Sequence, residues 1–211
     1  MKKLRGFLLM GLLVALTACS SNVEPQDSQS SQSENADETT ESSSTPAASS
    51  DNPAGSSLVA YFSYSGNTQQ IAESIAEKTG SEVFEITTAE GYPEDYDSVV
   101  DLAQEERNDQ ARPELGSELT NLEEYDTIYL GYPIWWSDMP MAVYSFLDDY
   151  DLAGKRIVPF CTHGGSGLSS TDTAIADEEP EATVLEGLAL WDSAIDDADA
   201  EIDEWLAAVN Q

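Results

Sequence analysis

The segment YFSYSGNTQQIAESIAEKTG, residues 61–80, joins two patterns of secondary structure. The chain is apolar up to Phe62, and from Thr68 onward apolar residues recur at helical spacing until Gly80. This pattern predicts a buried strand near residues 58–63, followed by a helix that stops at the glycine. Between the two lies a short corner of small polar residues.

That corner, SYSGNT at residues 63–68, has the composition of an anion-binding site. Gly66 can take a left-handed conformation at low cost, and the hydroxyl and amide side chains around it can donate hydrogen bonds. The first backbone N–H groups of a helix lack partners within the helix and lie at the positive end of its dipole. A phosphate would fit there. The alternative is an ordinary strand-to-helix corner capped by Thr68, and spacing alone favours neither interpretation.

The rest of the chain alternates strands with helices. Further strands are expected within residues 81–90, 126–133, 155–165 and 182–190, and further helices within 92–109, from 138 to about 149–154, and 196–210. The strands are apolar throughout, which favours a parallel sheet covered on both faces. The expected fold is therefore a three-layer α/β sandwich with a five-stranded parallel sheet in the order 2-1-3-4-5.

A second loop, GYPIWWSDMP at residues 131–140, places two adjacent tryptophans at the end of a strand. Each indole N–H needs a hydrogen-bond partner, so a core would rarely hold both there. At least one of Trp135 and Trp136 is expected to stack on a flat aromatic ligand. The alternative is that one of them plugs the end of the sheet.

A third loop, CTHGGSG at residues 161–167, follows the next strand. Its glycines would let the backbone approach a planar ligand closely. His163 has no visible partner for acid–base chemistry, so packing or hydrogen bonding is favoured over catalysis. Cys161 is expected to point into the core as a small apolar side chain. The three loops follow the carboxyl ends of parallel strands, so they should meet at one edge of the sheet. Ligands of open parallel sheets bind at that edge.

The strings YFSYSGNT, GYPIWW…MP and FCTHGGSG, in this order, resemble the flavodoxin family, and the resemblance runs from about residue 58 to 205. It implies FMN as cofactor. By motif position, the phosphate would be held by Ser63, Tyr64, Ser65, Gly66, Asn67 and Thr68. The isoalloxazine ring would be flanked by Pro133, Ile134, Trp135 and Trp136. Its pyrimidine edge would contact Thr162, His163, Gly164, Gly165 and Ser166.

The sequence departs from the family pattern in two places. The resemblance is strongest to a bacterial branch of the family that carries these strings nearly verbatim. Tyr64 occupies a position that is often basic in that branch, so help from a cation is missing there. The segment WDSAIDD, residues 191–197, is more acidic than the family pattern.

The amino-terminal segment predicts export. Lys2, Lys3 and Arg5 precede an apolar run that ends in LTAC, which resembles a bacterial lipoprotein signal box. Residues 1–18 are thus expected to be a signal peptide, with Cys19 acylated; an ordinary signal peptide or a retained anchor are the alternatives. Residues 19–56, rich in Ser, Thr and acidic residues, are expected to be a disordered tether to a domain at 57–211. The protein would lie on the outer face of the cytoplasmic membrane, or in the periplasm or outer membrane of a Gram-negative cell.

The domain is strongly acidic. Seven of the 41 acidic and three of the eight basic residues precede residue 57, which leaves 34 against 5 and a formal charge of −29. Nucleic acid and anionic membrane surfaces are therefore excluded as direct partners. A basic redox protein, a high-salt habitat and plain solubility would each account for the charge. With Cys161 as its one cysteine, the domain can form no internal disulfide, and the spacing typical of metal sites is absent.

The sequence leaves three functions open. The first is a membrane-tethered electron-transfer flavoprotein. The second is an FMN-dependent NAD(P)H:quinone-type oxidoreductase, against which stand the lack of a second dinucleotide site and the acidic surface. The third is a non-redox binding module on the same fold.

Overall fold

The computed structural model describes residues 56–211. The predicted signal peptide, the acylation of Cys19 and all but the last residue of the predicted tether lie outside the described residues. Within the described part of the chain, no helix is long and apolar enough to cross a membrane.

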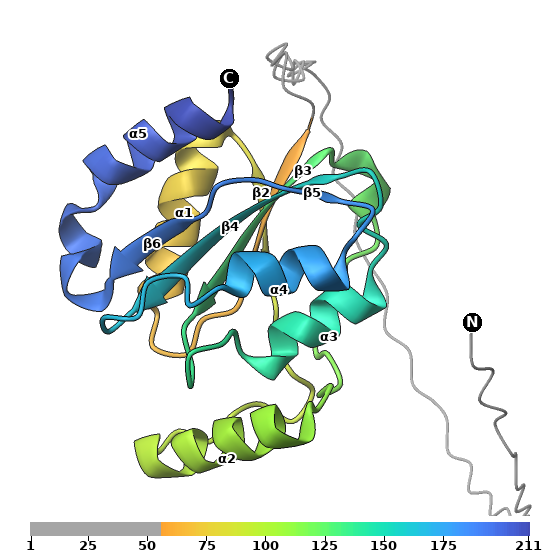
Figure 1. Cartoon of the computed structure of the whole chain (residues 1–211), viewed down its shortest axis with the longest axis vertical. Helices are drawn as coiled ribbons and strands as arrows, with labels where there is room; N and C mark the ends of the chain where they lie inside the picture. Colours follow the sequence, from red (N-terminus) through yellow and green to blue (C-terminus); the bar gives the residue numbers. More distant parts are fainter. Residues whose placement is uncertain (1–55) are drawn as a thin grey trace, which may run out of the picture. The chain divides into compact units, whose positions relative to one another are not determined.

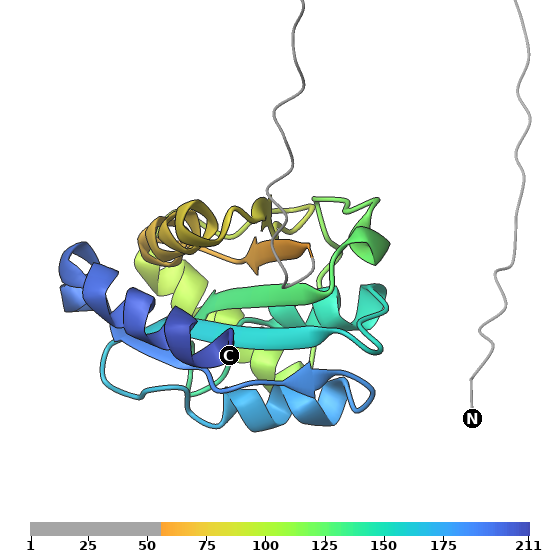
Figure 2. The ribbon, with the colours of Figure 1, turned by 90° about the horizontal axis from the view of Figure 1, so that it is seen from above.

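A parallel sheet forms the centre of the domain (Figures 1 and 2). Its strands are β1 (Ser57–Tyr61), β2 (Glu82–Glu85), β3 (Thr127–Pro133), β4 (Arg156–His163), β5 (Thr183–Val184) and β6 (Leu188–Trp191). The order is β2-β1-β3-β4-β5, and β6 also pairs in parallel with β4. The predicted order 2-1-3-4-5 is confirmed, with the fifth strand divided into β5 and β6, which pair with successive parts of β4.

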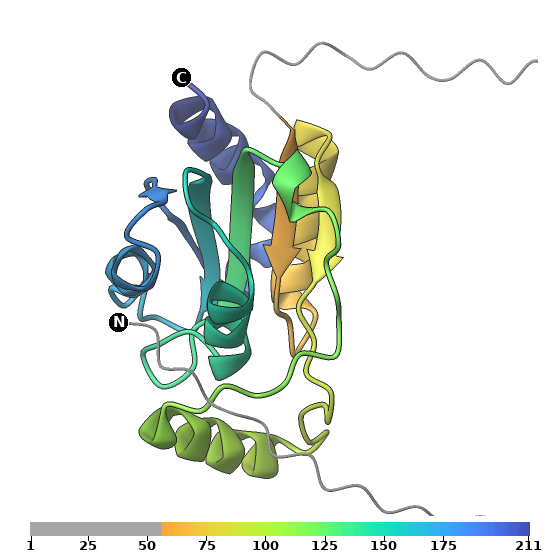
Figure 3. The same ribbon diagram turned by 90° about the vertical axis from the view of Figure 1, so that its right-hand side faces the viewer.

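Two helices cover each face of the sheet (Figure 3). On one face, α1 (Asn67–Thr79) and α5 (Asp199–Val209) bury their apolar residues against alternate positions of β1, β3 and β4. On the other face lie α3 (Met141–Asp149) and α4 (Thr171–Glu178). As predicted, α1 uses Ile71 and Ile75 as its core-facing positions, and it ends at Gly80 with φ +70°.

Helix α2 (Tyr96–Asp109) occupies a different place. It lies beyond the carboxyl ends of the strands, apart from both covering layers (Figures 1 and 3). Only Val99 and Ala103 of this helix are buried. Because it sits at the edge where the three loops converge, α2 belongs structurally to the candidate site.

The structure differs from the predicted elements in several places. Helix α4 was not predicted, because its TDTAIADE sequence has only one strongly apolar residue, Ile175. Helix α3 starts at Met141, not near Asp138, since a tight turn precedes it. A 3-10 helix, η2 (Asp192–Asp197), precedes α5, and a second one, η1, spans Leu122–Glu124. Strand β2 lies at the edge of the sheet and leaves Val83 47% exposed, so the sheet is not fully covered there.

Candidate functional site

The first loop connects β1 to α1 through Gly66, whose φ of +90° places it in the left-handed region. The Ser63 hydroxyl oxygen accepts a hydrogen bond from the backbone N–H of Gln69, at 3.2 Å, and thereby caps the helix. Within residues 56–211, the backbone N–H groups of Ser65, Gly66, Asn67 and Thr68 donate to no protein acceptor. This corner therefore offers a run of unpaired donors at the positive end of a 13-residue helix.

The second loop makes a tight two-residue turn at the end of β3. Trp135 and Asp138 exchange two backbone hydrogen bonds, of 2.8 and 2.9 Å, across Trp136 and Ser137. The two central residues have φ values of +52° and +62°. Left-handed backbone is strained in residues with a side chain, above all in a bulky one, so this turn is held by its surroundings.

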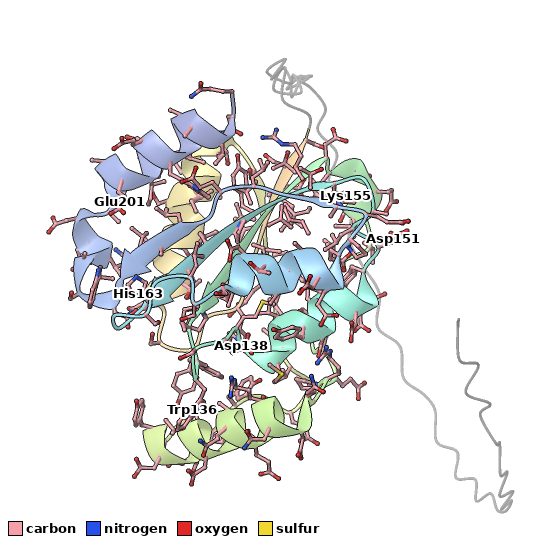
Figure 4. The ribbon with its side chains drawn as sticks, viewed as in Figure 1. Trp136, Asp138, Asp151, Lys155, His163 and Glu201 are labelled. Atoms are coloured by element: carbon pink, nitrogen blue, oxygen red, sulfur yellow. The ribbon has the colours of Figure 1, made fainter. Side chains whose placement is uncertain are left out.

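The two tryptophans have different environments. Trp135 packs edge-on against Phe62, Tyr64 and Tyr92, with ring centroids 5.3 to 5.8 Å apart, and so plugs the end of the sheet. Trp136 is 44% exposed, and its indole N–H donates to the backbone oxygen of Val100 in α2, at 3.2 Å. Figure 4 shows Trp136 between α2 and the ends of the strands. Of the pair, Trp136 is the one available to a ligand.

The third loop begins at the end of β4, where Thr162 and His163 are buried and Gly164, Gly165 and Ser166 are exposed. The His163 ring nitrogen Nδ1 accepts from the backbone N–H of Gly165, at 2.9 Å, and the imidazole packs 5.1 Å from Trp191. His163 thus orders the loop, as the sequence favoured. Cys161 is fully buried, and desolvation, with a smaller contribution from Asp192, raises the pKa of its thiol to about 12.

Direct contacts bring the three loops together. The hydroxyls of Thr68 and Thr162 are hydrogen-bonded at 2.9 Å, which joins the first loop to the third. The backbone N–H of Ile134 donates to the Thr162 carbonyl, also at 2.9 Å, which joins the second loop to the third. Tyr64 joins the first loop to the second through its contact with Trp135.

Tyr64 also contacts the segment that leads into α2. Its hydroxyl donates to the carbonyl oxygens of Pro93 and Glu94, at 2.8 and 3.1 Å. The Tyr64 side chain therefore links the first loop to the segment between β2 and α2. A family preference for a basic residue at this position gave no indication of that role.

Sequence reasoning missed an acidic neighbour of the first loop. Asp192, in η2, lies 3.5 Å from the amide nitrogen Nδ2 of Asn67, and its other carboxylate oxygen faces Gly164. Farther along α1, Asp196 accepts from Gln70 at 3.2 Å, and Asp199 accepts from Ser74 at 3.1 Å. The acidic composition of residues 191–197 indicated negative charge in this segment, but only the fold places these carboxylates beside α1.

Two cavities adjoin the loops. One, of about 460 Å³, lies between residues 62–64 and the segments 85–88 and 91–94. The other, of about 290 Å³, lies between α2 and the second loop, with Tyr64 as part of its wall. Neither is lined by residues of the third loop.

Comparison with known proteins adds independent information. The model of a protein family described as Flavodoxin matches residues 56–209. Among curated proteins, no significant match to this sequence was found.

Several solved structures are similar to this chain. Two proteins provisionally assigned as flavoproteins, from Bacteroides eggerthii DSM 20697 and Bacteroides uniformis ATCC 8492, are 32% and 33% identical to it, with TM-scores of 0.61 and 0.62. Each alignment covers 71% of this chain and 98% of the other. A flavoprotein from Lactobacillus acidophilus NCFM, solved in complex with FMN, is 25% identical over 68% of this chain and 98% of its own, with a TM-score of 0.58. With a family match across nearly the whole described domain, and with the predicted strand order in place, the chain belongs to the flavodoxin family.

Proposed function

We propose that this protein binds FMN where its three loops meet and that it transfers electrons as a lipid-anchored flavoprotein. The observation that carries the proposal is the run of unpaired backbone N–H groups at residues 65–68, on a loop joined to the second and third loops by direct contacts. The FMN complex of the similar Lactobacillus flavoprotein supports the choice of ligand.

The residues present fit FMN. The N–H groups of Ser65, Gly66, Asn67 and Thr68 would hold the phosphate, together with the Ser63 hydroxyl, whose proton is free because its oxygen accepts from Gln69. These donors are neutral and fixed, so a dianion can bind without a cationic side chain. Trp136, Ile134 and Pro133 would flank the isoalloxazine ring, whose pyrimidine edge would meet the exposed backbone at Gly164, Gly165 and Ser166.

The role of Trp135, Thr162 and His163 is to position these groups. Trp135 fixes the second loop through its aromatic neighbours, Thr162 fixes the third loop against Thr68, and His163 orders the glycines. When bound, FMN would supply the redox chemistry. The chain would set how readily an electron is accepted, and negative charge such as that of Asp192 disfavours an anionic reduced cofactor.

Location and partner complete the proposal. A lipid on Cys19 would hold the domain at the outer face of the membrane through the acidic tether. A basic redox protein is the partner that the charge of −29 suits, and charge steering of this kind weakens with salt. Electron-transfer rates that do not change between low and high salt would instead indicate that the charge serves solubility.

The test is the visible absorption spectrum of the purified full-length protein, titrated with FMN and then reduced without oxygen. We expect a yellow complex with one FMN per chain that is reduced and reoxidised reversibly. A colourless protein, or an affinity weaker than micromolar, would defeat the proposal. Bound FMN that cannot be cycled would favour a non-redox binding module, and rapid NAD(P)H oxidation by the complex would favour a reductase.

A further inference from the structure

The cavity between α2 and the tryptophan turn has the properties of a second ligand site. Four aromatic side chains contribute to its wall: Tyr64, Tyr96, Trp135 and Trp136. The remaining lining residues are aliphatic, with Ile134 from the second loop facing α2 residues such as Ala103. No charged side chain lines this space of about 290 Å³, although the domain around it carries 34 acidic residues.

Specific contacts hold the cavity's two walls in place. The Trp136 indole N–H donates to Val100, and Arg107 of α2 forms an ion pair with Asp138 of the turn, at 3.6 Å. Asp138 also accepts from the Tyr144 hydroxyl, at 2.9 Å, so the turn is tied to α3 as well. The strained φ values of Trp136 and Ser137 are maintained by these contacts, and they set the position of the indole that forms the wall.

The polar groups in the wall limit what can bind. The Tyr64 hydroxyl and the Trp136 indole N–H already donate to backbone carbonyls. An occupant would therefore find flat aromatic surfaces and few free hydrogen-bond donors. FMN itself is too large and too polar for this space, whose lining is aromatic and aliphatic.

We propose that this cavity binds an uncharged one- or two-ring quinone, next to but distinct from the FMN site. The inference rests on the proposed function, since a quinone is an electron acceptor suited to a flavoprotein. The cavity adjoins the FMN site because Ile134 and Trp136 belong to both. It is distinct because α2 forms its other wall and no residue of the third loop lines it, whereas that loop is part of the FMN site. Stacking between aromatic walls would supply most of the affinity.

The test uses oxidised full-length protein saturated with FMN, with no reductant present, and 1,4-naphthoquinone as the probe. NMR spectra of ¹⁵N-labelled protein report the indole N–H groups of its four tryptophans. We expect saturable shifts at Trp135 and Trp136, with a Kd on the order of 0.1 mM, and no shift at Trp205 on the opposite face of the sheet. Tryptophan-to-phenylalanine variants assign the signals.

Two variants of α2 complete the experiment. Ala103→Phe adds a ring inside the cavity and should weaken naphthoquinone binding at least tenfold. Gln104→Phe adds the same ring at an exposed position of the same helix and should leave binding unchanged. Both variants should keep the FMN affinity of the original chain.

Each contrary outcome is decisive. Absence of shifts at Trp135 and Trp136, or equal binding by the Ala103→Phe variant, would overturn the quinone site while FMN binding stands. Parallel loss of FMN and naphthoquinone in Ala103→Phe would show that the cavity is part of the FMN site, which also overturns the inference. Failure of the original chain to bind FMN in the preceding titration would refute the proposed function itself.

Discussion

Replacing Asp192 by Asn should tighten the binding of FMN, because the carboxylate lies beside the proposed phosphate site. Asp192 is 3.5 Å from the Asn67 side chain, whose backbone N–H is one of the unpaired donors. A phosphate on these donors would be roughly 7 Å from the carboxylate, given one hydrogen-bond length between phosphate and loop. Asparagine has the same shape and keeps an oxygen that can accept from Asn67, so the change removes charge with little change in structure.

The size of the effect follows from Coulomb's law. A unit charge and a dianion roughly 7 Å apart repel by about 1 kcal/mol in water and about 2 kcal/mol at half that dielectric constant. Since Asp192 is exposed, the lower figure applies, and salt reduces it further. The Asn variant should therefore bind FMN about 5-fold more tightly at low salt, with a smaller gain at high salt.

Quenching of FMN fluorescence on binding gives the affinity, and riboflavin provides the control ligand because it lacks the phosphate. Riboflavin affinity should not change in the Asp192→Asn protein. Asp196→Asn is the matched control variant, since Asp196 contacts Gln70, farther along α1, and it should have a smaller effect. Unchanged FMN affinity, or an equal gain for riboflavin, would refute the assignment of the phosphate to the Ser63–Thr68 corner.

Three further predictions concern stability. Ser137→Gly should stabilise the protein by about 0.5 kcal/mol in urea unfolding. Glycine removes the strain of a φ of +62°, although it also adds freedom to the unfolded chain. A loss of stability would mean that the turn is not strained. Gly131→Ala should cost about 3 kcal/mol, because its Cβ would lie 2.1 Å from the buried Phe160 ring, and a cost below about 1 kcal/mol would contradict this packing. Desolvation, with repulsion from Asp151, Asp148 and Glu178, raises the pKa of Glu179 to about 7 from 4.5, so the folded state binds the proton more tightly. The free energy of unfolding should then fall as pH rises from about 4.5 to 7. Glu179→Gln should raise Tm at pH 8 but have little effect at pH 4. An equal effect at both pH values would show that the ionisation of Glu179 does not lower stability.

The sequence alone was sufficient for most of the strands and for the three loops, because these depend on local patterns. The strand order was expected from the alternation of strands with helices, which suits this fold, and not from any local signal. The corner after β1 is an example: small polar residues between an apolar run and an amphipathic helix specify both the turn and its unpaired donors. Burial of Cys161 was predicted from its small apolar side chain, and packing or hydrogen bonding was predicted for His163 because it has no visible partner for acid–base chemistry. Helix α4 was missed because its apolar signal is weak.

Only the tertiary structure decided which of these residues meet. Nothing local distinguishes Trp135, which plugs the sheet, from Trp136, which reaches α2, because the difference arises from a strained turn held by Arg107 and by Val100. The position of α2 beyond the strand ends, and with it the second cavity, depends on contacts between distant segments. Asp192 and Asn67 are 125 residues apart in the chain, and a parallel sheet brings them together by placing the ends of β1 and β6 at the same edge. Composition counts this charge among the acidic residues, but only the fold places it beside the proposed phosphate site.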